Sequence, residues 1–93
     1  MCRRAEAYVE LTSTRDGRSL LQLVHHWLDS QRCGKENAMP ICVVLRDLSE
    51  LLGEIPDVYL VDAACYQLWL VGDMACEERM IYTHRANFWY RVR

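Results

Sequence analysis

The sequence has little glycine and proline, with four glycines and two prolines among 93 residues. The glycines stand far apart, at positions 17, 34, 53 and 72. This spacing excludes a glycine-rich loop directly ahead of a helix, which is the usual sequence signature of a phosphate-binding loop. We therefore expect no nucleotide site of that kind.

Long apolar runs and a strong excess of one charge are also missing. No run approaches the roughly 20 apolar residues of a membrane helix, and the first residues, MCRRAEAYVEL, lack the apolar stretch of a signal peptide. The formal net charge is −2, whereas proteins that bind nucleic acid mainly through phosphates are usually basic. We expect no membrane partner, and RNA is a partner that the net charge does not favour.

Paired metal ligands are absent as well, because the five cysteines stand apart at positions 2, 33, 42, 65 and 76. Structural zinc sites typically use closely spaced ligand pairs, and the adjacent His25 and His26 would point about 100° apart on a helix. We expect no metal and no cofactor. An odd number of thiols indicates a reducing, intracellular and cytoplasmic setting, with Cys42 and Cys65 as small buried apolar residues.

No motif in the chain indicates catalysis. Cys76 and His84 are close in sequence, but no nucleophile signature surrounds any cysteine. The acidic residues between positions 47 and 57, Asp47, Glu50, Glu54 and Asp57, are typical of a solvated helix face. We predict that the protein is not an enzyme and has no catalytic residues.

The first half of the chain predicts one strand and two helices. Residues 5–12 alternate between apolar and polar, which favours a half-buried strand. Residues 18–31 carry an apolar stripe at helical spacing. Helical spacing also runs from Ile41 to Ile55, although the β-branched start allows a short strand that leads into a helix at Asp47.

The second half predicts mainly strands. Residues 58–61 and 66–71 are strand-like and are joined by four residues, which is short enough for a hairpin. Residues 72–79 break the pattern and predict a turn or a single helical turn. Residues 80–93 return to alternation and predict a last strand.

Together these elements predict a single small α+β domain over residues 1–93, in which two helices pack on a mostly antiparallel sheet. The order is strand, helix, helix, hairpin, strand. Glutamates on the first strand and arginines on the last would form cross-strand pairs worth about 0.2–1 kcal/mol each. We therefore predict that the two terminal strands are neighbours.

Arginines and aromatic residues alternate near the C-terminal end, which suits either a protein interface or single-stranded nucleic acid. We predict a non-catalytic protein-interaction module, with an additional route to a homodimer through strand edges. The predicted partner-binding residues are Trp27, Arg85, Trp89, Arg91 and Arg93.

Three alternatives stay open. Half of the C-terminal rings could be core, with the arginines paired to Glu6 and Glu10. The chain could instead be a winged-helix RNA- or DNA-binding domain, with residues 58–71 as the β-wing and the basic-aromatic last strand on phosphates. A metal- or thiol-dependent protein is the last alternative.

The segment PICVVLRDLSELLGEIPDVYLV, followed by YQLWLV, resembles the end of a LOTUS (OST-HTH) domain. In that winged-helix family a helix closes on an Ile-Pro-Asp-Val-like stop and a β-wing follows. The residues that fit are Leu48, Leu51, Leu52, Ile55, Pro56, Asp57 and Val58.

A second resemblance involves both ends of the chain. AYVELTSTRDGRSLLQLV looks like the closing strand and helix of the nuclease-like half of an extended Tudor domain, and GDMAC with NFWYRVR looks like the first strands of a Tudor barrel. LOTUS and Tudor modules occur together in germline RNA-granule proteins. The two resemblances therefore imply a scaffold or adaptor in such an assembly.

Overall fold

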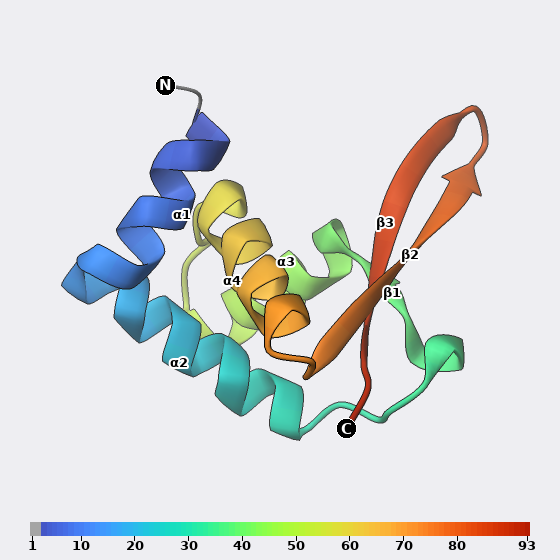
Figure 1. Ribbon diagram of the computed structural model, residues 1–93, viewed down its shortest axis with the longest axis horizontal. Helices are drawn as coiled ribbons and strands as arrows, with labels where there is room; N and C mark the ends of the chain where they lie inside the picture. Colours follow the sequence, from blue (N-terminus) through green and yellow to red (C-terminus); the bar gives the residue numbers. More distant parts are fainter. Residues whose placement is uncertain (1–2) are drawn as a thin grey trace.

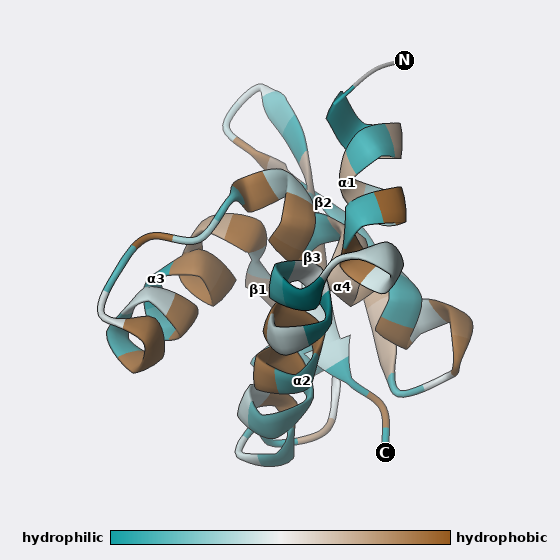
Figure 2. Ribbon diagram, turned by 90° about the vertical axis from the view of Figure 1, so that its left-hand side faces the viewer, coloured by the Kyte–Doolittle hydropathy of each residue, from teal (hydrophilic) through white to brown (hydrophobic). Residues whose placement is uncertain are grey.

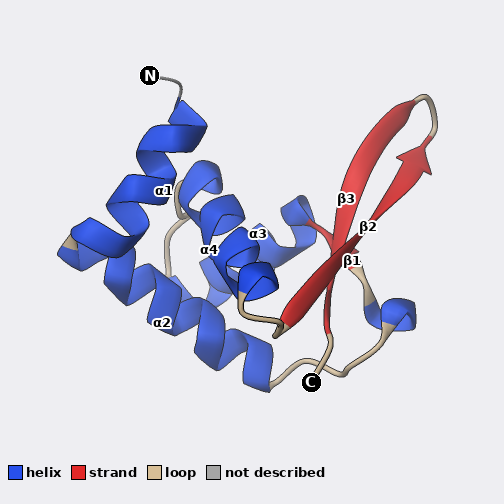
Figure 3. Cartoon of the chain, viewed as in Figure 1, coloured by secondary structure: helices blue, strands red, loops and turns tan. Residues whose placement is uncertain are grey.

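Four α-helices gather on one side of the molecule and a three-stranded antiparallel sheet stands on the other (Figures 1 and 3). The computed structural model describes residues 3–93. The elements in chain order are α1 (Arg3–Ser13), α2 (Arg15–Asp29), the 3₁₀ turn η1 (Lys35–Asn37), β1 (Met39–Pro40), α3 (Ile41–Leu52), α4 (Val58–Leu70), β2 (Met74–Ile81) and β3 (His84–Arg91). The predicted α+β class is confirmed, but the helices number four and not two.

Helix α4 occupies the centre of the fold and contacts α1, α2, α3 and β2. Its sequence is apolar on nearly every side, which is typical of a helix buried among other elements. The hairpin predicted over residues 58–71 is therefore wrong. A short apolar run of this kind cannot be distinguished from a buried helix by its periodicity.

The start of α4 is fixed by Asp57, whose side chain accepts a hydrogen bond of 2.8 Å from the backbone N–H of Tyr59. This N-cap satisfies one of the donors that every helix leaves unpaired in its first turn. Pro56, directly before the cap, restricts the preceding backbone to extended conformations, which separates α4 from α3.

Residues 5–12 lie within helix α1, so the strand predicted there is wrong. Ala7 and Leu11 are fully buried one helical turn apart, and α1 packs against α2 and α4. The alternation that suggested a strand also places these two residues on one helix face.

The predicted pairing of the terminal strands is wrong for the same reason, because β3 pairs with β1 and β2. The C-terminal arginines accordingly do not reach Glu6 and Glu10. Their acidic partners are close in the sheet or its entry turn: Arg79 pairs with Glu77, Arg85 with Glu78 and Arg93 with Asp73.

Helices α2 and α3 confirm the two helices that the sequence predicts. Thr14 caps α2 by accepting a 3.0 Å hydrogen bond from the backbone N–H of Gly17. Helix α3 begins directly after Pro40 and ends at Gly53, whose φ of 78° lies in the left-handed region that glycine tolerates. The alternative start at Asp47 is wrong, since only Met39 and Pro40 ahead of the helix are extended.

The C-terminal part of the chain forms a hairpin, so the single last strand predicted over residues 80–93 is wrong: β2 reaches Ile81 and β3 begins at His84. The chain turns after α4, and β2 already begins at Met74, so the turn predicted over residues 72–79 is correct only at its start. In the hairpin Cys76 lies opposite Trp89 and Ile81 lies opposite His84. Strand β3 is the central strand, which explains why Trp89 is buried there.

One core joins the helices to the base of the sheet. Trp27 lies in it with only 3% of its surface exposed, and its indole N–H donates a 3.2 Å hydrogen bond to Asp47 of α3. The largest fully buried side chains are Leu11, Val24, Val44, Leu48, Val61, Cys65, Leu68 and Met74. Every helix contributes to this list, so the loss of one helix would expose the others.

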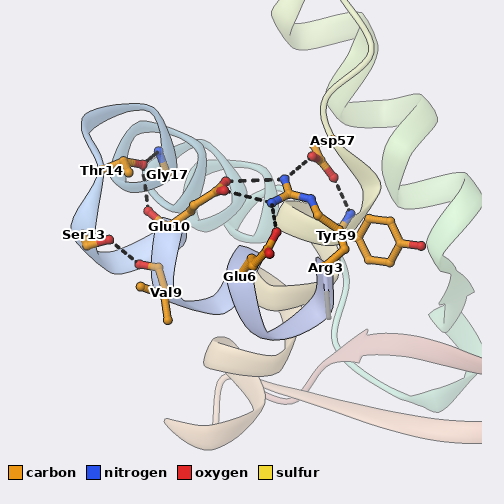
Figure 4. A network of polar contacts seen from close by, with 9 residues as sticks. All are labelled: Arg3, Glu6, Val9, Glu10, Ser13, Thr14, Gly17, Asp57 and Tyr59. Carbon is orange, nitrogen blue, oxygen red and sulfur yellow. Dashed lines mark hydrogen bonds and ion pairs between the residues drawn. The ribbon is translucent and has the colours of Figure 1, made fainter. Parts of the chain in front are cut away.

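A polar clasp holds α1 against the start of α4 (Figure 4). The guanidinium of Arg3 donates to Glu10 at 2.8 Å and also pairs with Asp57. Arg3 lowers the pKa of the Asp57 carboxyl from its ordinary 3.8, chiefly through the hydrogen bond between them. The same carboxylate caps α4, so one charged group serves both contacts.

This clasp predicts a pH-dependent effect of Asp57→Asn. Asparagine caps a helix as well as aspartate does, so the substitution removes the charge and keeps the cap. Because the folded-state pKa is lowered, the stabilisation is present above pH 3.8 and is lost as the pH falls through the lower folded value. We expect urea denaturation to show a less stable variant at pH 7 and a difference that shrinks in acid.

The matched variant is Asp57→Ala, which removes the cap as well. It should lose about 1 kcal/mol for the cap at both pH values. A difference between Asp57→Asn and the wild type that stays constant from pH 7 into acid would contradict the clasp.

Candidate functional site: an aromatic cleft

A cleft lies where α1, α4 and the β2–β3 hairpin meet. It encloses about 540 Å³, which is within the range of about 300–1,000 Å³ found for ligand pockets. Figure 1 shows α4 between α1 on one side and the hairpin on the other. The residues that line it include Arg4, Tyr8, Asp62, Tyr66, Trp69, Cys76, Asn87 and Trp89.

Three aromatic rings form a continuous row in this cleft. Tyr66 and Trp69 are three residues apart on α4 and so share a helix face; their ring centroids are 5.3 Å apart. Tyr8 of α1 meets Tyr66 edge to face at 6.0 Å. The Tyr8 hydroxyl donates a 3.0 Å hydrogen bond to the Gln67 side chain, which fixes its ring against α4.

All three rings of the row are exposed to solvent, whereas Trp89, a fourth ring that lines the cleft, is buried. Trp69 keeps 45% of its surface exposed, whereas Trp89 on β3 is 4% exposed. Apolar atoms dominate the lining, so an occupant would remove aromatic surface from water, worth about 25 cal/mol per Å². The cleft therefore favours binding of a partly apolar group.

Asp62 is the acidic group of the cleft and lies one turn before Tyr66 on the same face of α4. It is half-buried. Among residues 3–93, no arginine, lysine or histidine nitrogen forms an ion pair with its carboxylate. Its negative charge contributes to a raised pKa at two nearby thiols, Cys65 and Cys76.

The cysteines differ in their surroundings. Cys65 is buried in α4, as predicted, and burial raises its pKa to about 12. Cys42 is exposed, so the prediction that it is buried is wrong; it lies on the outer side of α3, away from Val44 and Leu48. Burial and then Asp62 raise the pKa of Cys76. Cys2 lies outside the described residues.

The thiol and imidazole considered for catalysis are not neighbours. Cys76 is five residues from Ile81, the partner of His84, which corresponds to about 17 Å along a strand. A raised pKa also leaves Cys76 as the neutral thiol, which is the less nucleophilic form. Among residues 3–93, no group of three or more histidine, cysteine or acidic side chains could hold a metal ion.

The predicted partner-binding residues are spread over the molecule and do not form one site. Trp27 lies in the core beneath α3, and Trp89 is buried at the base of the cleft. Arg85 is exposed near the tip of the hairpin, 3.4 Å from Glu78. Only Trp89 lines the aromatic cleft.

The last two predicted residues, Arg91 and Arg93, bind the C-terminal end of the chain to the end of α2 and to the turn after α4. The guanidinium of Arg91 donates hydrogen bonds of 3.1 Å to the carbonyls of Asp29 and Gln31. Arg93 donates to the Val71 carbonyl and to the Asp73 carboxylate, each at 2.9 Å. The guanidinium groups of Arg91 and Arg93 therefore donate most of their hydrogen bonds to groups of the same chain.

Sequence reasoning missed Tyr8, Asp62, Tyr66 and Trp69. The signal was present, because positions 62, 66 and 69 share one face if the segment is a helix. The sequence predicts strands at residues 58–61 and 66–71. This prediction places Asp62 in the turn between them and separates it from the aromatic residues.

A second apolar surface lies at the junction of α3 and α4, a part of the chain that Figure 2 colours largely as hydrophobic. Ile55 is 83% exposed there. The exposed apolar residues of this surface are Leu51, Leu52, Ile55, Val58 and Tyr59.

Comparison with protein-family models, with curated proteins and with solved structures finds no match for this chain. None of the helices within residues 3–93 has the length and apolar character needed to cross a membrane. Residues 3–93 form a small α+β domain with four α-helices, a three-stranded antiparallel sheet and an aromatic cleft between them.

Proposed function

We propose that this protein is a non-catalytic interaction module that binds a protein partner in the aromatic cleft. The observation that carries the proposal is the row formed by Tyr8, Tyr66 and Trp69, which is held in place by the fold yet exposed to solvent. Exposed tryptophan and tyrosine side chains in a concave, pre-formed site are the usual anchors of protein interfaces.

The chemistry of the cleft supports binding over turnover. It offers aromatic surface, one carboxylate and a thiol whose pKa is raised. A nucleophilic site would need a base within hydrogen-bond distance of the thiol, and His84 is far along the hairpin.

The setting we propose is the intracellular one that the LOTUS and Tudor resemblances imply, in which the domain acts as an adaptor in an RNA-granule-type assembly. Strand β2 lies at one edge of the sheet, so pairing of two β2 edges is the route we propose to a homodimer. Sedimentation of the purified protein over a range of concentrations tests this route.

The interaction function is tested by selecting peptides from a random display library on the purified protein. We expect Trp69→Ala to weaken the selected peptides by about 30-fold, the effect of losing a binding anchor worth about 2 kcal/mol. Binding is measured by fluorescence anisotropy with labelled peptides.

Tyr59→Ala is the matched control, because Tyr59 lies on the same helix, is similarly exposed at 42% and does not line the cleft. It should leave peptide affinity unchanged. Equal affinity of the peptides for the Trp69→Ala variant and the wild type would refute the cleft as the binding site.

A second candidate function, RNA or DNA binding by a winged helix, is favoured by the order of the elements. Helices α2, α3 and α4, with β1 between the first two and the β2–β3 hairpin at the end, follow the order of a winged-helix domain. In this arrangement the wing is the β2–β3 hairpin and not residues 58–71. Helix α4 would then enter the nucleic acid groove.

The residues of α4 argue against that use. The segment VYLVDAACYQLWL contains no lysine or arginine and contains one aspartate, whereas groove-reading helices rely on basic and amide side chains. We expect a single-stranded RNA and a DNA duplex to bind weakly even at low salt. Tight binding that falls steeply as salt rises would favour the winged-helix function instead.

A further inference from the structure

We propose that the aromatic cleft receives a cationic side chain, a lysine or arginine of the partner protein, with Asp62 as its counter-charge. This inference rests on the proposed interaction function and specifies the chemistry of the partner. The observation behind it is the combination of a half-buried, unpaired carboxylate with a row of aromatic rings in one cleft.

The position of Asp62 allows its carboxylate to pair with a cation that lies against the aromatic rings. It lies on α4 one turn from Tyr66, so its carboxylate and the tyrosine ring share the same face. The carboxylate is half-buried, and a partly buried charge is screened less by salt than an exposed one. Its charge also contributes, after burial, to the raised pKa of Cys76, which lines the same cleft.

Aromatic rings add a second attraction for a cation. Tyrosine and tryptophan attract an ammonium or guanidinium group within about 6 Å of the ring centroid. The chain already forms one such contact, since the guanidinium of Arg79 lies 5.0 Å from the centre of the Phe88 ring. The long apolar stem of a lysine or arginine would cover the rings while its charged end meets Asp62.

Within residues 3–93, Arg4 is the cationic residue that lines the cleft. It lies on α1, is exposed to solvent, and forms no ion pair with Asp62. Because exposed charges are strongly screened, we expect the half-buried Asp62 carboxylate, and not Arg4, to set the charge of the side chain that the cleft binds. An acidic side chain paired with Arg4 is the competing outcome that the experiment must distinguish.

The test uses the peptides selected on the wild-type protein. We expect each to contain a lysine or arginine whose replacement by norleucine weakens binding about tenfold, as the loss of a cation–π contact and a charge pair together implies. Asp62→Asn should weaken the original peptides by a smaller factor, because it removes the charge pair and leaves the cation–π contact. The norleucine peptides should bind Asp62→Asn and wild type equally, because they carry no charge that could pair with Asp62.

The outcomes separate this inference from the proposed function. Peptides that lose affinity for Trp69→Ala but bind Asp62→Asn as tightly as wild type leave the interaction function standing and overturn the cationic partner. Peptides that owe their affinity to an aspartate or glutamate, and lose it with Arg4→Gln, also overturn it.

A measurement on the unmodified protein covers the case in which Asp62→Asn does not fold. Blocked derivatives of lysine, norleucine and glutamate are added at equal millimolar concentrations, and the indole N–H signals of Trp69 and Trp89 are followed by NMR. The lysine derivative should shift the Trp69 signal more than the other two. Equal shifts for lysine and norleucine, no shift for any derivative, or a larger shift for glutamate overturn the inference.

Discussion

Trp89→Ala is expected to destabilise the folded protein by about 3–5 kcal/mol, the usual cost of truncating a buried large aromatic residue. Trp89 lies on the central strand, opposite Met39 on one side and Cys76 on the other, with 4% of its surface exposed. Small domains have a total stability of about 5–15 kcal/mol. A large fraction of the variant should therefore be unfolded at 37 °C, as circular dichroism during thermal and urea denaturation would show.

Trp69→Ala is the control for this prediction, because it removes the same side chain from an exposed position in the same cleft. Its stability should stay close to that of the wild type, while its affinity for the selected peptides falls. If Trp89→Ala folded normally and lost only partner binding, Trp89 would be a binding anchor, as the sequence suggested, and its assignment to the core would be wrong.

Gly17→Ala should also destabilise the protein, by about 1–3 kcal/mol or more, as expected for overpacking. In an ordinary helix the same substitution would stabilise by about 0.5–1 kcal/mol. The sign reverses because a Cβ at Gly17 would lie 2.1 Å from the Glu10 carbonyl oxygen and 2.6 Å from the Leu11 Cα, and backbone atoms cannot move aside as a side chain can.

Ser19→Ala on the exposed side of α2 is the matched control, and it should leave the denaturation midpoint in urea unchanged or slightly raised. A stabilised Gly17→Ala variant would show that α1 and α2 do not cross as closely as the structure indicates. Figure 4 shows this corner, where Thr14 caps α2 beside Glu10.

Helices α2 and α3 could be predicted from the sequence because each is amphipathic and lies at the surface. One face of α2 carries Leu20, Val24 and Trp27, which are buried, while His25 and His26 are exposed. This contrast is what helical periodicity detects. Pro40 and Gly53 then mark the boundaries of α3.

Helices α1 and α4 could not be predicted in the same way. In α1 the residues Ala7 and Leu11 satisfy both a two-residue and a helical period. In α4 both faces are apolar, because the helix contacts three other helices and the sheet. The hydrophobic pattern then no longer shows which side of the segment faces the core. The strand propensity of its valine and aromatic residues therefore leads to the wrong prediction of a hairpin.

Because the sequence predicts a hairpin over residues 58–71, it does not predict the aromatic cleft. Asp62, Tyr66 and Trp69 come together only if the chain between them is helical, and Tyr8 joins them only because α1 packs against α4. The predicted C-terminal arginines could have bound a partner, but Arg91 and Arg93 donate hydrogen bonds within the chain. Arg91 donates to carbonyls at the end of α2, and Arg93 donates to a carbonyl in the turn after α4.

Local spacing and capping residues were enough to predict the α+β class and the two amphipathic helices. Packing between elements sets the helical state of α4, the burial of residues in the C-terminal hairpin, and the place where the aromatic rings meet a carboxylate. These features depend on contacts between segments far apart in the chain. Burial by neighbouring elements can select a helix where local preference favours a strand.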